Sequence, residues 1–204
     1  MDCFKIEQGS SLVRVFHASP QAPEVDVYVD GNLAFSDIEF KEFTKYVYLD
    51  EGNHNVEVYL AGTKESPVIS QIVDVPDGEM ITVAAIGNLD ELSLLAIPDD
   101  VSKEVSDSYS TFRVIHLSPD APAVDILEGE ETLFEDIEFG EGTDYVEVEP
   151  GKYNVKIALS SDGTVVLPLE IRLNPNRIYT IYAVGDAANL SAIQSVDGNT
   201  YICR

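Results

Sequence analysis

The sequence predicts an all-β protein made of two tandem immunoglobulin-like antiparallel β-sandwich domains, each with about seven strands. Three observations predict this fold class. The chain of 204 residues contains an internal repeat. Short stretches that alternate apolar and polar residues recur along it, separated by turn signals such as DGN, EPGK and PDGE. No segment shows the hydrophobic period of a helix.

The repeat is clearest in one motif. HASPQAPEVDVYVD, at residues 17–30, returns as HLSPDAPAVDILEG at residues 116–129, an offset of 99 residues. The tetrapeptide DIEF of residues 37–40 recurs letter for letter at 136–139. Between the copies lies the polar segment VSKEVSDSYS, which has no core-forming pattern. The predicted parts are an N-terminal tail (1–10), a first domain (11–100), a linker (101–110) and a second domain with a short C-terminal extension (111–204).

Comparison of the two copies indicates which side chains face the core. In NVEVYL and its counterpart NVKIAL, the positions of Val56, Val58 and Leu60 stay apolar in both copies, which predicts that they point inward. The positions of Glu57 and Tyr59 vary, which predicts that they face solvent. In the first copy we predict strands near 12–17, 24–29, 44–49, 55–60, 68–75, 80–86 and 92–97, with equivalents in the second copy.

The repeated motif resembles a known family. VRVFHASPQAPEVDVYVDG and FRVIHLSPDAPAVDI resemble the opening signature of the bacterial family called domain of unknown function 4397, and YVEVEPGKYNVKI and YTIYAVG resemble its later strands. The resemblance covers residues 11–100 and 111–198. It implies a β-sandwich module that occurs in tandem on secreted or surface-associated proteins. It implies no reaction, because that family has no established activity.

The motif contains the residue types of a hydrolytic triad in each copy. A serine nucleophile needs a base and an orienting carboxylate, and His17, Ser19 and Asp26 supply these types. However, no G-x-S-x-G turn surrounds Ser19, and Pro20 after it favours an extended backbone. The whole set also occurs twice, which is unusual for an active site. We therefore expect no enzymatic activity, with a hydrolase as the least favoured alternative.

A structural role explains the motif better. His17 continues the inward row of Val13 and Val15 and stands at the end of its predicted strand. A neutral imidazole can donate one hydrogen bond and accept another, and an aspartate can accept from turn amides or from the imidazole. We therefore predict a structural loop clamp in each copy, formed by His17, Ser19 and Asp26 and by His116, Ser118 and Asp125.

Metal binding is the alternative interpretation of the same region. Asp26, Asp30 and Asn32 offer oxygen ligands of the kind that calcium takes. Their spacing is not that of an EF-hand loop, and the second copy has GEE where the first has DGN. Zinc would need a third ligand beside His17 and His116. Calcium is thus an open alternative, and no other cofactor is predicted.

Tyrosines distinguish the first copy from the second. Tyr28, Tyr46, Tyr48 and Tyr59 lie in the first copy, whereas only Tyr145 stands at an aligned position of the second. The strand alternation predicts that Tyr48 and Tyr59 point outward. Exposed aromatic faces bind sugars and proteins, so these four residues predict a possible surface for a carbohydrate or protein partner.

Composition limits the classes of partner. The chain carries 37 acidic and 12 basic side chains, for a formal charge of −25, and it has no Lys/Arg cluster. Such a field repels phosphate backbones, which excludes nucleic acid and anionic membrane surfaces as partners. No apolar run is long enough to span a bilayer, and MDCFKIEQGS lacks the basic and apolar regions of a signal peptide.

Two cysteines lie near the chain ends. Cys3 and Cys203 fall in no metal-binding spacing, so we expect two free thiols, with a bridge between the ends as the alternative. Taken together, the sequence predicts a non-enzymatic structural or interaction module, associated with the cell envelope or surface as the resemblance implies. A calcium- or carbohydrate-binding domain is the second hypothesis.

Overall fold

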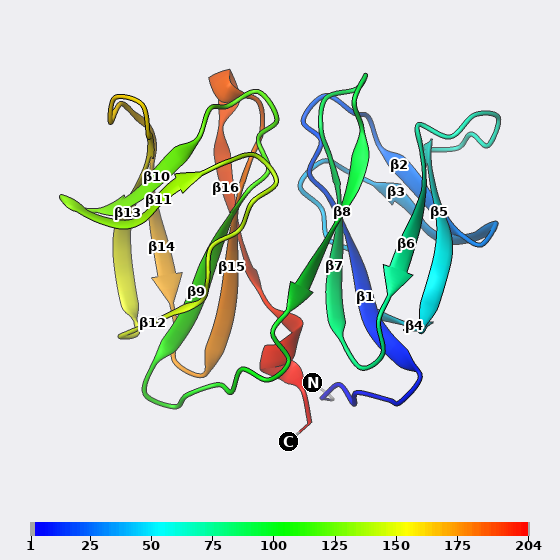
Figure 1. Cartoon of the computed structure of the whole chain (residues 1–204), viewed down its shortest axis with the longest axis horizontal. Helices are drawn as coiled ribbons and strands as arrows, with labels where there is room; N and C mark the ends of the chain where they lie inside the picture. The colour runs from blue at the N-terminus through cyan, green and yellow to red at the C-terminus, as the bar shows by residue number, and fades with distance from the viewer. Residues whose placement is uncertain (1–2, 204) are drawn as a thin grey trace. The chain divides into compact units, whose positions relative to one another are not determined.

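The computed structural model describes residues 3–203, and strands make up nearly all of their regular structure (Figure 1). The prediction of an all-β fold with two sandwich-like bodies is confirmed. Contacts between residues divide the chain into two compact units: the first extends to Ser102 and takes in the segment after Thr200, and the second is Lys103–Thr200. Within the described residues, no helix has the length and apolar character needed to cross a membrane.

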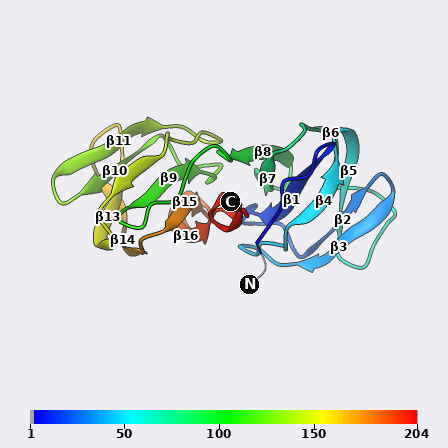
Figure 2. The same cartoon turned by 90° about the horizontal axis from the view of Figure 1, so that it is seen from below.

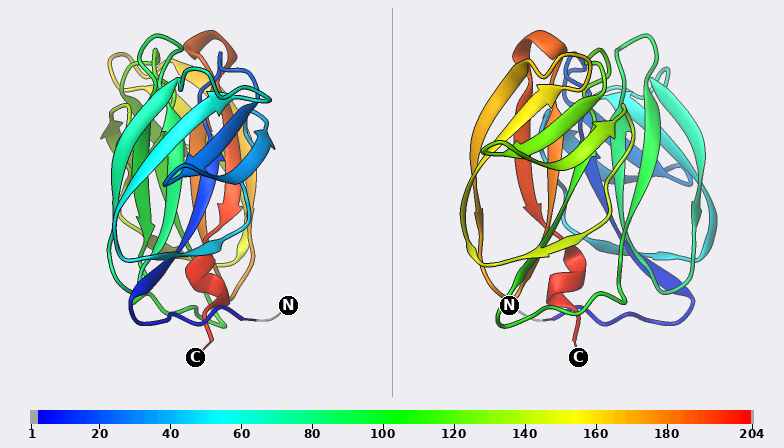
Figure 3. Two further views of the ribbon diagram at one scale, coloured as in Figure 1. Left: turned by 90° about the vertical axis from the view of Figure 1, so that its right-hand side faces the viewer. Right: turned by 60° about the vertical axis from the view of Figure 1, so that its left-hand side comes forward.

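The first unit consists of two four-stranded sheets, ordered β4-β1-β7-β8 and β3-β2-β5-β6. The second of these sheets, coloured blue to blue-green, faces the viewer in the left panel of Figure 3. The strands are β1 (Ser10–His17), β2 (Val25–Val29), β3 (Asn32–Ile38), β4 (Val47–Asp50), β5 (Gly52–Leu60), β6 (Ile69–Val75), β7 (Met80–Ile86) and β8 (Ser93–Asp99).

The second unit repeats this plan, with sheets ordered β12-β9-β15-β16 and β11-β10-β13-β14. Two short 3-10 helices, η1 (Ala187–Asn189) and η2 (Gly198–Tyr201), flank its last strand. The strands are β9 (Ser110–His116), β10 (Val124–Glu128), β11 (Glu131–Ile137), β12 (Val146–Val148), β13 (Gly151–Leu159), β14 (Val165–Leu173), β15 (Arg177–Val184) and β16 (Ser191–Val196).

One strand pairing differs from the predicted antiparallel sandwich. β1 runs parallel to β7, and Figure 2 shows β1 between β7 and β4. β9 and β15 pair in the same parallel way. One sheet of each unit is therefore mixed. The parallel register places His17, the last residue of β1, beside Ala85, and so brings the repeated motif next to the end of β7.

Within residues 3–203 each unit has eight strands, one more than the seven strand positions predicted from the sequence. The missing strand is β3, which pairs with β2 through a two-residue turn. Asp30 and Gly31 in this turn both adopt left-handed backbone angles, with φ values of 49° and 79°. A pair of left-handed residues matches the twist of a tight hairpin, so the DG pair joins two strands directly.

The core of each unit lies between its two sheets. The buried core is aliphatic in the first unit and also includes Phe112 and Tyr179 in the second. Val56 and Val58 of β5 are buried in it, as the comparison of the copies predicts. The inward prediction for Leu60 is wrong, since this side chain is 37% exposed. Leu60 is the last residue of β5, and the chain turns away after it at Ala61 and Gly62.

Candidate functional site

The repeated histidine binds the loop that follows its own strand. His17 is 1% exposed, and its Nε2 lies 3.1 Å from the carbonyl oxygen of Pro23. In the second unit, His116 Nε2 lies 3.2 Å from the carbonyl oxygen of Pro122. A carbonyl oxygen can only accept, so Nε2 carries the proton and donates in both units. Each ring therefore fastens the proline-rich loop to the end of the first strand.

The other ring nitrogen is not placed to act as a base for the serine hydroxyl. His116 Nδ1 accepts a hydrogen bond from the backbone N–H of Ser118 at 3.2 Å. His17 Nδ1 is buried and has no hydrogen-bond partner among residues 3–203. The Ser118 amide thus holds His116 as the neutral tautomer with the proton on Nε2, whereas His17 donates from Nε2 and has no acceptor for a second proton on Nδ1 among the described residues.

Burial has an electrostatic consequence for these two rings. Desolvation lowers the pKa of His17 and of His116 below the usual histidine range, although the hydrogen bonds to Pro23 and Pro122 partly oppose it. Because the folded pKa is depressed, the neutral ring favours the folded state fully above the usual pKa. This contribution is lost as the pH falls through the folded pKa.

The two serines are buried within the same loops. Ser19 Oγ donates to the carbonyl oxygen of Gly87 at 2.7 Å, which ties the loop after β1 to the end of β7. Ser118 is equally buried, and its Oγ has no hydrogen-bond partner among the described residues. Neither hydroxyl is hydrogen-bonded to a histidine ring, so the structure does not assemble the nucleophile–base pair that a hydrolase uses.

The aspartates act at a different place from the histidines. Asp26 accepts hydrogen bonds from the backbone N–H groups of Asp37 and Gly62, both at 2.9 Å. Asp125 accepts from the backbone N–H of Asp136 at 2.8 Å and from the hydroxyl of Ser160. The predicted clamp is therefore divided. The histidine of each unit, together with Ser19 in the first, holds the loop after the first strand, whereas aspartate holds the end of the β2–β3 or β10–β11 hairpin.

The backbone that the aspartates hold is strained in the same way in both units. Asp37 and Asp136 each have a φ of 54°, a left-handed angle that side chains with a Cβ seldom adopt. A hydrogen bond from each of these amides to a carboxylate offsets part of that cost. Asp26 and Asp125 thus support matching bends next to β-bulges in the hairpins.

The calcium candidates do not converge on one point. Asp26 binds two backbone amides, whereas Asp30 binds the ring of His54 through Oδ2 and the amide of Asn55 through Oδ1. Asn32 donates its side-chain amide to the carbonyl oxygen of Asp30 at 3.3 Å. Among the described residues, no group of three or more histidine, cysteine, aspartate or glutamate side chains is arranged to hold a metal ion.

The third histidine differs from the other two. His54 Nδ1 lies 2.7 Å from Asp30 Oδ2, and Nε2 lies 2.8 Å from the carbonyl oxygen of Asp50. Burial lowers the pKa of His54, but the hydrogen bonds and negative charges of these two residues outweigh it, and the pKa is raised. The hydrogen bond from His54 in turn lowers the pKa of Asp30.

The four tyrosines do not form one surface. Tyr28 and Tyr59 lie on the sheet that contains β2 and β5, with their rings 5.3 Å apart edge to face. Tyr46 and Tyr48 lie at β4 of the other sheet. Tyr46 donates its hydroxyl to Asp99 at 2.9 Å. Tyr48 is 48% exposed, as predicted, and donates to the carbonyl oxygen of Lys5 at 2.8 Å.

The prediction that Tyr59 faces solvent is wrong. Only 5% of Tyr59 is exposed, and its side chain lies beside Tyr28. Tyr28 packs against it, and Glu57 Oε1 accepts a hydrogen bond from the Tyr59 hydroxyl at 3.3 Å. Lys64 lies over the ring of Tyr28, with Nζ 4.0 Å from the ring centre. These neighbours cover the aromatic surface of Tyr28 and Tyr59 through packing and a cation–π contact.

The expectation of two free thiols is also wrong. Cys3 and Cys203 form a disulfide with a Cα–Cα distance of 5.0 Å, 200 residues apart in sequence. Phe4 and Ile202 form a short β-bridge beside it. Because the segment after Thr200 belongs to the first unit, the bond ties the two ends of the chain together within that unit.

Comparison with known proteins identifies the repeated fold. The family described as Domain of unknown function (DUF4397) matches this chain twice, over residues 11–127 and 110–201. No curated protein matches it. Among solved structures, a carbohydrate-binding module of family CBM26 from Eubacterium rectale Amy13K, in complex with maltoheptaose, covers 93% of this chain and 99% of its own. That likeness has 9% identity and a TM-score of 0.30, which is too low to carry an argument.

Proposed function

This chain belongs to the family of Domain of unknown function (DUF4397), and we propose that it is a non-enzymatic structural and binding module of the cell envelope or cell surface. The proposal rests on the structural role of the repeated motif. In both units its histidine and aspartate side chains hold the backbone of neighbouring segments. The motif therefore stabilises the fold, and we expect other parts of each unit to contact a partner.

The disulfide supports a location outside the reducing cytosol. Structural disulfides persist in oxidising compartments, and Cys3–Cys203 joins the two ends of the chain. The strongly acidic composition suits a protein that stays soluble and contacts cationic groups or neutral surfaces. A protein or a carbohydrate of the envelope is the class of partner that fits these properties.

A serine-directed fluorophosphonate probe tests the non-enzymatic part of the proposal. Because the Ser19 and Ser118 hydroxyls are buried and not bonded to histidine, we expect no labelling of the purified full chain. The Ser19→Ala/Ser118→Ala double variant is the matched control. Labelling of the wild type that disappears in this variant would overturn the proposal and restore a hydrolase.

Co-sedimentation with isolated cell envelopes tests the binding part. We expect the intact, oxidised chain to sediment with envelopes of its source, and an unrelated acidic protein of similar size to stay in solution. The Ser19→Ala/Ser118→Ala variant should sediment like the wild type if it remains folded, because the proposal gives these serines no partner contact. A chain that stays in solution at every ionic strength tried would contradict the proposed envelope association.

A further inference from the structure

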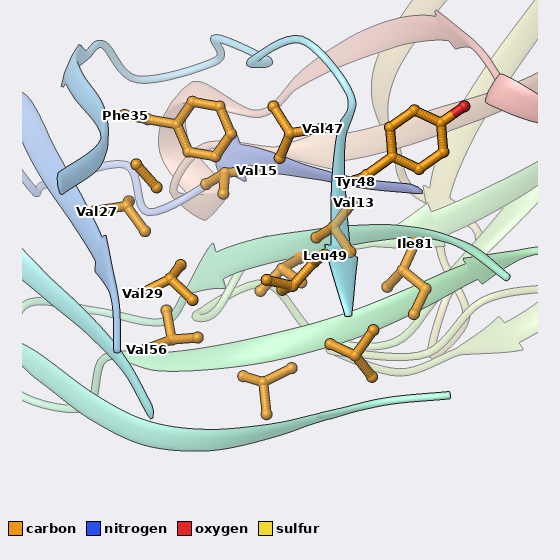
Figure 4. Close-up of a pocket in the computed structure, with 14 residues that line it drawn as sticks. Val13, Val15, Val27, Val29, Phe35, Val47, Tyr48, Leu49, Val56 and Ile81 are labelled. Atoms are coloured by element: carbon orange, nitrogen blue, oxygen red, sulfur yellow. The ribbon is translucent and has the colours of Figure 1, made fainter. Parts of the chain in front are cut away.

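An apolar cavity of about 170 Å³ lies between the two sheets of the first unit. Strands of both sheets line it, and Figure 4 shows valines of β1, β2 and β5 directed into the same space. Tyr48 brings the only polar side-chain atom to the lining, and its hydroxyl already donates to Lys5. Protein interiors seldom hold voids larger than a water molecule, so a cavity of this size needs an explanation.

The cavity has an entrance at the sheet edges. β3 and β4 are edge strands of different sheets, and each contributes lining residues. Val47 is 40% exposed, and Ala34 and Tyr48 are also exposed, so the lining reaches solvent between these two strands. Phe35 and Leu49 are half-buried behind them. We expect a small molecule to enter between these two strands.

The corresponding cavity of the second unit is smaller, about 130 Å³ against about 170 Å³ in the first unit. The strand registers align Val13 of β1 with Phe112 of β9, and Ile81 of β7 with Tyr179 of β15. In the second unit these larger side chains occupy the core between the sheets. Five further lining positions change in the same direction, namely Val27 to Ile126, Ala34 to Leu133, Val73 to Ile171, Val75 to Leu173 and Val83 to Ile181, whereas Leu49 becomes the smaller Val148.

This corresponding cavity of the second unit also differs in the chemistry of its lining. It measures about 130 Å³ and is lined in part by Glu128, which replaces the aligned Val29 of the first unit. A carboxylate beside an apolar ligand would have to lose its hydration, which is unfavourable. Of these two cavities, that of the first unit is thus the one lined without a charged side chain.

We propose that the first unit binds a small neutral apolar molecule in this cavity, the size of a benzene ring or a short alkyl chain. An apolar protein cavity of about 150 Å³ stays dry and binds benzene. The volume of this cavity is similar, so a ligand of similar size fits it. The lining includes no cationic side chain, and the chain carries a charge of −25, so an anionic group such as a fatty-acid carboxylate would be repelled. The cavity lining does not include His17, Ser19 or Asp26, the side chains of the repeated motif on which the proposed function rests.

Titration with toluene, followed by methyl NMR of the full oxidised chain, tests this proposal. We expect saturable shifts of the Val13, Val15 and Val83 methyl signals, and no comparable shifts from the second unit. Val13→Phe and Val83→Ile install the residues of the second unit and should weaken binding by about tenfold or more. Ile72→Phe adds bulk at an exposed position of β6 and should leave the affinity unchanged.

Three results would overturn the proposal. They are the absence of saturable shifts up to the solubility limit of toluene, equal shifts in both units, and an affinity that Val13→Phe and Val83→Ile leave unchanged. If Val13→Phe disturbs the fold, the milder Val83→Ile decides. None of these results bears on the role of the repeated motif, so failure here would be distinguishable from failure of the proposed function.

Discussion

Reduction of the Cys3–Cys203 disulfide is expected to lower the free energy of unfolding by about 2–5 kcal/mol. The bond joins residues 200 positions apart, and cross-linking so long a loop removes much entropy from the unfolded chain. Once it is reduced, backbone hydrogen bonds such as those of Phe4 with Tyr201 and Cys203 still hold the C-terminal segment, but closing the loop now costs its full entropy. Urea unfolding with and without dithiothreitol measures the difference.

The Cys3→Ser/Cys203→Ser variant is the matched control for this experiment. It should unfold at the same urea concentration as the reduced wild type and should not respond to dithiothreitol. Two thiols titrated in the unfolded but unreduced wild type would contradict the bond, as would a midpoint that dithiothreitol leaves unchanged.

Replacing Gly87 by alanine is expected to lower the free energy of unfolding of the first unit by about 3 kcal/mol. Gly87 has a φ of 96°, and an added Cβ would lie 2.3 Å from the carbonyl oxygen of Glu91. Since that oxygen belongs to the backbone, the whole β7–β8 turn must shift. The shift would also move the carbonyl that accepts the hydrogen bond from Ser19. Urea unfolding, followed at NMR signals of the first unit, measures the loss.

Variants of two further glycines distinguish the effect of steric overlap on stability from the effect of backbone strain. Gly31 has a φ of 79° but no atom within 4 Å of an added Cβ, so Gly31→Ala should cost only about 1 kcal/mol. Gly185 is the counterpart of Gly87, and an added Cβ would lie 2.5 Å from the oxygen of Asn189. Gly185→Ala should therefore destabilise the second unit as Gly87→Ala does the first. Equal losses at Gly31 and Gly87 would show that the overlap contributes nothing.

Much of the fold is predictable because its determinants are local. Alternation in NVEVYL and turn signals such as PDGE indicate strands and their ends without knowledge of their partners. β3 was missed because Asn32–Ile38 is mostly exposed and carries little alternation, although the DG pair before it is a hairpin signal. The parallel pairing of β1 with β7 depends on residues far apart in sequence, and no local pattern encodes it.

The candidate site was predictable in its residues but not in its contacts. The repeat identifies His17, Ser19 and Asp26, yet their partners are backbone groups of Pro23, Gly87 and other loops, and a backbone group has no sequence signature. The burial of Tyr59 likewise depends on side chains of a neighbouring strand and loop rather than on alternation within β5.

From the sequence, the disulfide is only the less favoured alternative and the cavity is not predicted, for a different reason. Two cysteines at opposite ends of a chain pair only if the termini meet, and the meeting of Phe4 with Ile202 is a property of the tertiary fold. The aligned copies give one indication of the cavity, because Val13 aligns with Phe112 and Ala34 aligns with Leu133. Where one copy of a repeat has smaller side chains at buried positions than the other copy has, unfilled space is expected between the sheets of that copy.

The most direct test of the central claim, that the repeated motif is a scaffold, is an NMR pH titration of the chain's three histidines. We expect His17 and His116 to remain neutral, with the proton on Nε2, at pH values where His54 is already charged. His54 serves as the internal reference, because its pKa is raised whereas theirs are lowered. A His17 or His116 ring that titrates at or above the usual histidine pKa, or that carries its proton on Nδ1, would contradict the scaffold role.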